Sequence, residues 1–171
     1  MRERRTAVHG GRRDREFEAF VAGASGRLLH TATLLTAELP RDNPRARHLL
    51  TLALAHTYAS WDRLHGEDPY SRAREYLAGR FAHAAWHRYG AFGRARPHPH
   101  STLAGLAPRE RLILVLRLYE GVPEQQTAAL LGLPVERVRA LCDRATATLL
   151  HPPRRPAQPV TAPRVPKAAA S

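Results

Sequence analysis

Residues 123–149 read PEQQTAALLGLPVERVRALCDRATATL, and this stretch decides the fold of the C-terminal part of the chain. Pro123 and Pro134 each suit the first position of a helix, where a missing N–H costs little. Gly132 lies where the first helix must end, because glycine tolerates the left-handed conformation found at helix C-termini. Ala128 is small, so a second helix can cross closely over the first. The spacing therefore predicts two short helices joined by a tight turn, which is a helix-turn-helix.

The second of these helices is amphipathic and basic. Its apolar positions recur at helical spacing and are Val135, Val138, Leu141, Cys142, Ala145 and Leu149, with Leu130, Leu131 and Leu133 facing them. Three arginines lie off this apolar side, and arginine suits bidentate contact with guanine as well as contact with phosphate. Because a helix of this kind enters the major groove of DNA, we expect DNA contacts here. The candidate contacts of this recognition helix are Val135, Glu136, Arg137, Arg139, Ala140 and Arg144. The alternative is an ordinary helical hairpin with a solvated basic face.

The composition of the chain also favours a nucleic-acid partner. The chain has 171 residues and a formal net charge of +12, with ten histidines besides, which favours a polyanionic partner. Its single cysteine, Cys142, excludes an intramolecular disulfide and lies on the apolar side of the recognition helix, as an inert buried thiol would. We find no signal peptide and no apolar run long enough to span a membrane. We therefore expect a cytoplasmic protein with no membrane partner.

No pattern typical of an enzyme accompanies this charge. The sequence has neither a phosphate-binding glycine loop nor an ordered Ser-His-Asp set. His83 and His87 are four residues apart, but no carboxylate follows His83 as in the zinc-protease pattern, so ordinary surface histidines are the simpler interpretation. The segment PHPH at residues 97–100 is typical of a polar linker. We predict a protein that is not an enzyme, with no catalytic residue, no metal site and no cofactor.

The rest of the chain reads as helical. Apolar residues at helical spacing predict helices near 17–35, 46–57 and 70–84, and a fourth over about 108–120. Residues 90–107 are rich in Gly, Pro and His without an apolar period, which is typical of a linker. We expect an all-α fold of two small helical domains joined by a flexible linker. The predicted boundaries are 1–13 for a disordered N-terminal arm, 14–90 for a three-helix domain, 91–106 for the linker, 107–150 for the helix-turn-helix domain and 151–171 for a disordered tail rich in proline and arginine.

Three segments resemble the extracytoplasmic-function group of sigma factors, within the sigma-70 family. Residues 14–36, DREFEAFVAGASGRLLHTATLLT, are similar to the first helix of the N-terminal domain in that group, which is called region 2. Residues 57–64, TYASWDRL, are similar to the end of its second helix. Residues 106–119, LAPRERLILVLRLY, followed by the helix-turn-helix, resemble its C-terminal domain, which is called region 4. Together these segments span most of residues 14–150.

The resemblance implies a sequence-specific, DNA-binding transcription initiation factor that directs RNA polymerase to promoters. The N-terminal domain would bind core RNA polymerase and would recognise and open the minus-ten element. The helix-turn-helix would read the minus-thirty-five element of double-stranded promoter DNA. Family members are often held inactive by an anti-sigma protein, which is therefore a further partner that the resemblance implies.

The minus-ten role would fall on the third predicted helix. With the apolar side of this helix facing the core, Trp86 projects to roughly the opposite side. An exposed aromatic ring among basic side chains suits base stacking and phosphate attraction on a single strand. The alternative is that Trp86 packs against the linker or the C-terminal domain. The candidate minus-ten contacts are Arg72, Arg80, His83, Trp86 and Arg88.

One departure concerns the surface that contacts polymerase. The family usually carries an acidic pair and a glutamine in the second helix, where this chain has Arg47, His48 and Thr51. The local charge is inverted, and like charges across an interface cost several kcal/mol. The resemblance is thus compatible with a divergent sigma factor, or with a sigma-derived DNA-binding regulator that does not bind core polymerase. A third hypothesis is a protein-interaction module whose helix pairs bind a helical partner.

Overall fold

The structure is a computed structural model that describes the backbone of residues 2–64, 66–87 and 96–152, and the side chains of residues 11–64, 66–85 and 96–152. Its helices in chain order are α1 (Arg2–Thr36), α2 (Pro44–Ala59), η1 (Trp61–Arg63), α3 (Pro69–His87), α4 (Pro108–Leu114), η2 (Val115–Tyr119), α5 (Glu124–Leu131) and α6 (Val135–Leu150). Over the described residues, β-type pairing is limited to one isolated bridge between Leu39 and Asp42. The predicted all-α fold class is confirmed.

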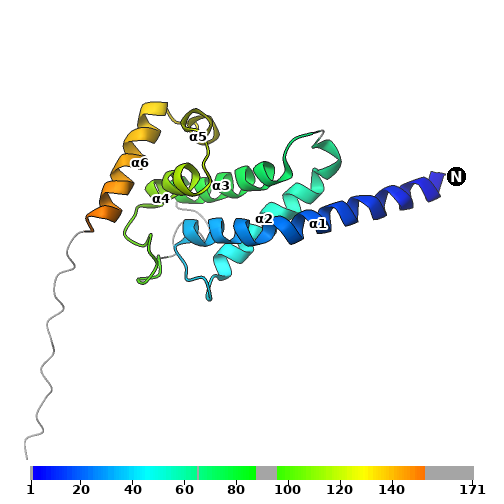
Figure 1. Ribbon diagram of the computed structural model, residues 1–171, viewed down its shortest axis with the longest axis horizontal. Helices are drawn as coiled ribbons and strands as arrows, with labels where there is room; N and C mark the ends of the chain where they lie inside the picture. Colours follow the sequence, from blue (N-terminus) through cyan, green and yellow to red (C-terminus); the bar gives the residue numbers. More distant parts are fainter. Residues whose placement is uncertain (1, 65, 88–95, 153–171) are drawn as a thin grey trace, which may run out of the picture.

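The helices form two groups that lie against each other (Figure 1). Helices α1, α2 and α3 pack together, α4 packs on α1 and α3, and α5 and α6 continue from α4 at one end. The N-terminal end of α1 projects beyond the other helices on the side away from α6. The helix-turn-helix therefore lies at one end of the molecule, supported from below by α4 and α3.

The apolar positions predicted for the first three helices form the core between them. In α1, Leu28, Thr31 and Leu35 are fully buried, and in α3 the buried positions include Leu77 and Phe81. The buried residues of α2 are Ala46, Leu49, Ala53 and Thr57. Because these positions recur every three to four residues, each helix presents one continuous apolar side to its neighbours.

The N-terminal arm differs from the prediction. The sequence predicts disorder over residues 1–13, but α1 already begins at Arg2. Two contacts help to explain why the helix extends through residues 12 and 13. Arg12 forms an ion pair with Glu16 one turn later at 3.5 Å, and Arg13 reaches Asp62 at 3.0 Å and stacks over the Tyr58 ring at 4.2 Å. The residues before Arg12 follow as a continuation of the same helix.

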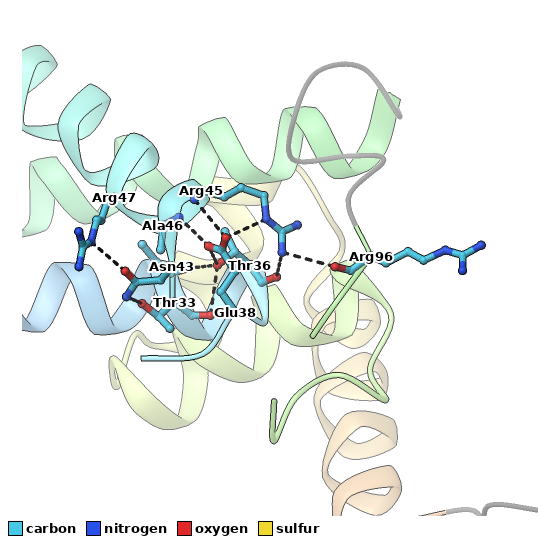
Figure 2. A network of polar contacts seen from close by, with 9 residues as sticks. Thr33, Thr36, Glu38, Asn43, Arg45, Ala46, Arg47 and Arg96 are labelled. Carbon is cyan, nitrogen blue, oxygen red and sulfur yellow. Dashed lines mark hydrogen bonds and ion pairs between the residues drawn. The ribbon is translucent and has the colours of Figure 1, made fainter. Parts of the chain in front are cut away.

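The corner between α1 and α2 is built around one carboxylate (Figure 2). Glu38 accepts hydrogen bonds from the Ala46 backbone N–H at 2.8 Å, the Arg45 backbone N–H at 3.1 Å and the Thr36 hydroxyl at 2.9 Å. The Arg45 Nε donates to the same carboxylate at 3.0 Å. The N-terminal N–H groups of a helix have no partner within the helix, so a carboxylate placed there both caps α2 and complements its dipole. Glu38 thereby fixes the angle at which α2 leaves α1.

The predicted linker contributes to the core. Leu103 and Leu106 are 6% and 3% exposed and lie in one apolar cluster with Leu77 and Phe81 of α3 and Leu116 of η2. The backbone N–H of residue 98 donates to the carbonyl of residue 37 at 2.8 Å, which ties this segment to the α1–α2 corner. Residues 91–95 of the predicted linker and residues 153–171 of the predicted tail lie outside the described residues. The two groups of helices thus share one core, and the predicted domain boundaries stay a prediction.

Candidate nucleic-acid interface

The helix-turn-helix forms at the predicted residues. Helix α5 ends at Leu131, and Gly132 follows with φ 62° and ψ 37°, which is the left-handed conformation expected of glycine at this place. Pro123 and Pro134 each lie one residue earlier than predicted, as the N-cap residues of α5 and α6. The backbone N–H of Leu133 donates to the carbonyl of Ala128 at 3.0 Å and closes the turn.

The apolar side of α6 packs onto α4 and α5. Val138, Leu141 and Ala145 are buried, and Val135 and Cys142 are half-buried. Leu149 was expected on the same side but is 37% exposed, because the supporting helices do not extend to the end of α6. The supporting side chains that pack with this side of α6 are Ile113, Ala128, Leu131 and Leu133. Burial of Cys142 raises the pKa of its thiol, consistent with the inert thiol predicted from its position.

The outer side of α6 carries the three predicted arginines, and the structure separates them. Arg139 is exposed but held by a bidentate ion pair, with Nε and Nη2 at 3.1 and 3.2 Å from the two carboxylate oxygens of Glu124. Arg144 is 60% exposed and lies 3.9 Å from Glu110 of α4. No described side chain bonds to the exposed Arg137 guanidinium. The structure thus leaves Arg137 and Arg144 more available for a ligand than Arg139.

The remaining predicted contacts of α6 divide by exposure. Glu136 and Ala140 are exposed on the outer side, whereas Val135 is half-buried and packs against the apolar cluster formed with α4 and α5. Glu136 and Asp143 are both exposed, so the outer side of α6 carries negative as well as positive charge. Sequence reasoning missed Glu124 and Glu110 as partners, because no helical spacing links residues of different helices.

The predicted minus-ten residues are only partly described. Arg80 and His83 are exposed on α3, and Arg72 is half-buried, with a buried Nε that has no hydrogen-bond partner among the described atoms. Trp86 belongs to α3, but its side chain lies outside the described residues, as does the whole of Arg88. The exposed position of the Trp86 ring therefore stays a prediction, and so does the alternative in which the ring packs against the linker or the C-terminal domain.

Arg72 lines a hollow that sequence reasoning missed. The hollow has a volume of about 210 Å³ and is also lined by His56 of α2 and by Glu75 and Tyr76 of α3. The His56 and Tyr76 rings stack at 4.1 Å with an interplanar angle of 14°. The hollow combines an aromatic surface with both hydrogen-bond donors and acceptors. Its residues come from two helices, so no motif in the sequence marks it.

The residues at the predicted polymerase-contacting surface lie on the outer side of α2. Arg47, His48 and Thr51 are all exposed. The Arg47 Nε donates to the Asn43 side-chain oxygen at 3.0 Å (Figure 2), and the Thr51 hydroxyl donates to the Arg47 carbonyl at 3.0 Å. The inverted charge expected from the sequence is therefore presented to solvent.

None of the described helices is both long and apolar enough to cross a membrane. Among the same residues, histidine, cysteine, aspartate and glutamate side chains form no group of three or more suited to a metal ion.

Comparison with known protein families bears on the C-terminal part of the chain. The family model "Sigma-70, region 4" matches residues 102–150, which include α4, η2, α5 and α6. No curated protein and no solved structure matched the chain. Residues 102–150 are therefore similar to region 4 of the sigma-70 family, and the match supports a helix-turn-helix of the DNA-binding kind in this part of the chain. This agrees with the resemblance drawn from residues 106–149.

Proposed function

We propose that the protein is a transcription initiation factor that directs RNA polymerase to promoters, as a sigma factor of the extracytoplasmic-function type. The observation that carries the proposal is the region 4 match over a helix-turn-helix whose outer side exposes Arg137 and Arg144. A helix supported on its apolar side, with exposed arginines on the other, fits the major groove of DNA. The net charge of +12 adds a general attraction to phosphate.

On this proposal α6 reads the minus-thirty-five element, and Arg137 and Arg144 are its main contacts. The Glu124 carboxylate orients Arg139, which suits a phosphate contact at the edge of the groove better than base reading. Helix α3 and its basic residues Arg72 and Arg80 would serve the minus-ten element, together with His83, Trp86 and Arg88. The charge of these side chains and the hollow beside Arg72 support this assignment.

The first prediction concerns the recognition helix. Replacing Arg137 or Arg144 with Ala should weaken binding to a selected promoter duplex by about 1–3 kcal/mol, the amount expected for an arginine that reads a base. Fluorescence anisotropy at fixed salt measures the affinity. Arg15→Ala is the matched control, since it removes the same charge from an exposed position on α1. Unchanged affinity for both recognition-helix variants would contradict the role given to α6.

A second candidate function is a sigma-derived regulator that binds DNA without core polymerase. The exposed Arg47 and His48 favour it, because they replace negative with positive charge on α2. In vitro transcription with core polymerase on a promoter library separates the two functions. Polymerase-dependent transcripts from specific promoters support the initiation factor. DNA binding without stable association with core polymerase supports the regulator, and a loss of salt dependence in DNA binding would point to the protein-interaction module instead.

A further inference from the structure

The carboxylate of Glu120 is buried at the junction of the two groups of helices. Glu120 follows η2 directly, and its side chain is 0% exposed. The Tyr70 hydroxyl donates to its two carboxylate oxygens at 2.9 and 3.0 Å. The Thr31 hydroxyl also donates to it. Arg27 and Arg74 lie 3.6 and 3.9 Å from the same carboxylate.

Every one of these partners belongs to the N-terminal group of helices. Thr31 and Arg27 lie on α1, and Tyr70 and Arg74 lie on α3, so the partners are 46 to 93 positions away in the sequence. A buried carboxylate is stable only when charged or hydrogen-bonding groups surround it. Glu120 therefore keeps its environment only while η2 remains seated between α1 and α3.

The apolar residues at this junction also stay buried only while the two groups of helices are packed together. Leu112 and Leu116, from α4 and η2, share one cluster with Leu35 of α1 and with Leu77 and Phe81 of α3. Separation of the two groups would expose these side chains to water. Beside them, the Tyr119 ring lies 5.1 Å from His30 and within 5.8 Å of the Arg27 guanidinium, both on α1.

Another residue at the junction of the two groups of helices, Arg111, favours their separation. Arg111 of α4 is 4% exposed, and its Nε has no hydrogen-bond partner among the described atoms. Its Nη1 donates to the carbonyl of Leu103 at 3.4 Å, and its guanidinium lies 5.9 Å from the Phe81 ring. Burial, followed by the nearby charge of Arg45, lowers the pKa of Arg111 to about 10. A buried guanidinium with so few partners favours opening of the junction, because opening returns it to water.

We infer that Glu120 is a latch that holds the helix-turn-helix group closed on α1 and α3, against the opening tendency of the buried Arg111. The latch is a conformational device, and its residues lie on α1, α3 and the end of η2, whereas α6 packs mainly on α4 and α5. If the proposed function holds, the closed latch keeps α6 at one fixed distance from α3. Reading two promoter elements at any other spacing then requires the latch to open.

The test compares two identical chemical changes in the full chain. Glu120→Gln removes the charge at the junction, and Glu124→Gln removes a charge that pairs only within the helix-turn-helix, with Arg139. Hydrogen exchange measures opening of α4 and η2, and small-angle scattering measures compactness. We expect exchange in α4 and η2 to accelerate roughly a hundredfold in Glu120→Gln, with a larger radius of gyration. Glu124→Gln should leave both readouts as in the wild type.

Two further variants keep the inference falsifiable if Glu120→Gln fails to fold. Tyr70→Phe removes only the hydroxyl donor and should accelerate opening by a smaller factor. Arg111→Met removes the buried charge and should slow opening. Wild-type exchange and compactness in Glu120→Gln, or in both of these variants, would overturn the latch.

The outcome is independent of the proposed function, because both readouts are taken without DNA. Affinity for a short duplex carrying only the element read by α6 should stay unchanged in Glu120→Gln. If the wild-type protein does not bind this duplex, the proposed function is rejected, whereas the inference about Glu120 is not affected.

Discussion

The carboxylate of one residue, Glu38, stabilises the corner between α1 and α2. Glu38 caps α2 and accepts hydrogen bonds from Arg45, Ala46 and Thr36, while being 7% exposed. Burial alone raises the pKa of Glu38, but the hydrogen bonds from Ala46, Arg45 and Thr36 outweigh it, so the pKa lies below its ordinary value of 4.5. A carboxylate with a lowered pKa stabilises the folded state in its charged form.

This gives a prediction about acid stability. Because the folded-state pKa of Glu38 is depressed, its contribution is fully present above pH 4.5 and disappears as the pH falls through the lower folded-state value. Glu38→Gln should lower the free energy of unfolding at pH 7 by about 1–3 kcal/mol, the range for hydrogen bonds to a charged group. It should also flatten the decline in stability below pH 4.5. Urea unfolding at several pH values measures both effects, and an unchanged acid decline would contradict the role of Glu38.

The arginines of α6 show how far residue-level reasoning reaches. Helical spacing correctly placed Arg137, Arg139 and Arg144 on the exposed side of the helix. It did not distinguish among them, because the difference comes from Glu124 on α5 and Glu110 on α4. These partners are 15 and 34 positions away in the sequence, and only the packing of three helices brings them together.

At the scale of elements, the turn between α5 and α6 sets the position of the recognition helix. Gly132 has φ 62°, and a Cβ added there would meet no atom within 4 Å. Any cost of a side chain at this position therefore comes from the backbone conformation alone. The sequence predicted this turn correctly, because Gly132 and Pro134 are local signals.

We expect Gly132→Ala to destabilise the protein by about 1–2 kcal/mol, the cost of the left-handed conformation for a residue with a Cβ. Gly132→Asn should cost less, since asparagine tolerates this conformation. Gly105→Ala is the control, because a Cβ at Gly105 also meets nothing within 4 Å and the backbone there is not left-handed. Chemical unfolding measures the three variants. Equal stability of Gly132→Ala and Gly105→Ala would show that the turn is not strained by a side chain.

The element before this turn was predicted less completely. The sequence predicts one helix over about 108–120, whereas the structure widens its last turn into η2. The backbone N–H of Glu120 donates to the carbonyl of Val115 at 2.9 Å, five residues earlier. A widened turn of this kind changes the direction of the side chains that follow it. Here it precedes Glu120, whose carboxylate is directed between α1 and α3.

At the scale of the whole molecule, the two groups of helices are joined through one apolar core. Leu103 and Leu106, from the predicted linker, pack in it with residues of α1, α2, α3 and η2. The smaller cluster around Val138 and Leu141 belongs to α4, α5 and α6. A truncating substitution in the shared core should therefore destabilise both groups of helices. A truncating substitution in the smaller cluster should destabilise only the group formed by α4, α5 and α6.

Phe81→Ala tests this arrangement. Phe81 is 2% exposed, so its truncation should destabilise the protein by about 3–5 kcal/mol. Hydrogen exchange should accelerate in α1 and α2 as well as in α4. Val138→Ala, in the smaller cluster, should accelerate exchange in α5 and α6 and leave α1 and α2 unchanged. If Phe81→Ala accelerates hydrogen exchange in α3 alone, the two groups of helices do not depend on one core for their stability.

Local signals in the sequence by themselves determined the all-helical class, the apolar sides of the helices, the helix-turn-helix and the outward direction of its arginines. Each of these depends on residues within one or two helical turns, where spacing and capping chemistry act directly. Only the tertiary structure decided that residues 103 and 106 enter the core, that Glu124 holds Arg139, and that Glu120 is buried between α1 and α3. These features join residues far apart in the chain, and the free energy that joins them comes from burial and paired charges that exist only once the helices have packed.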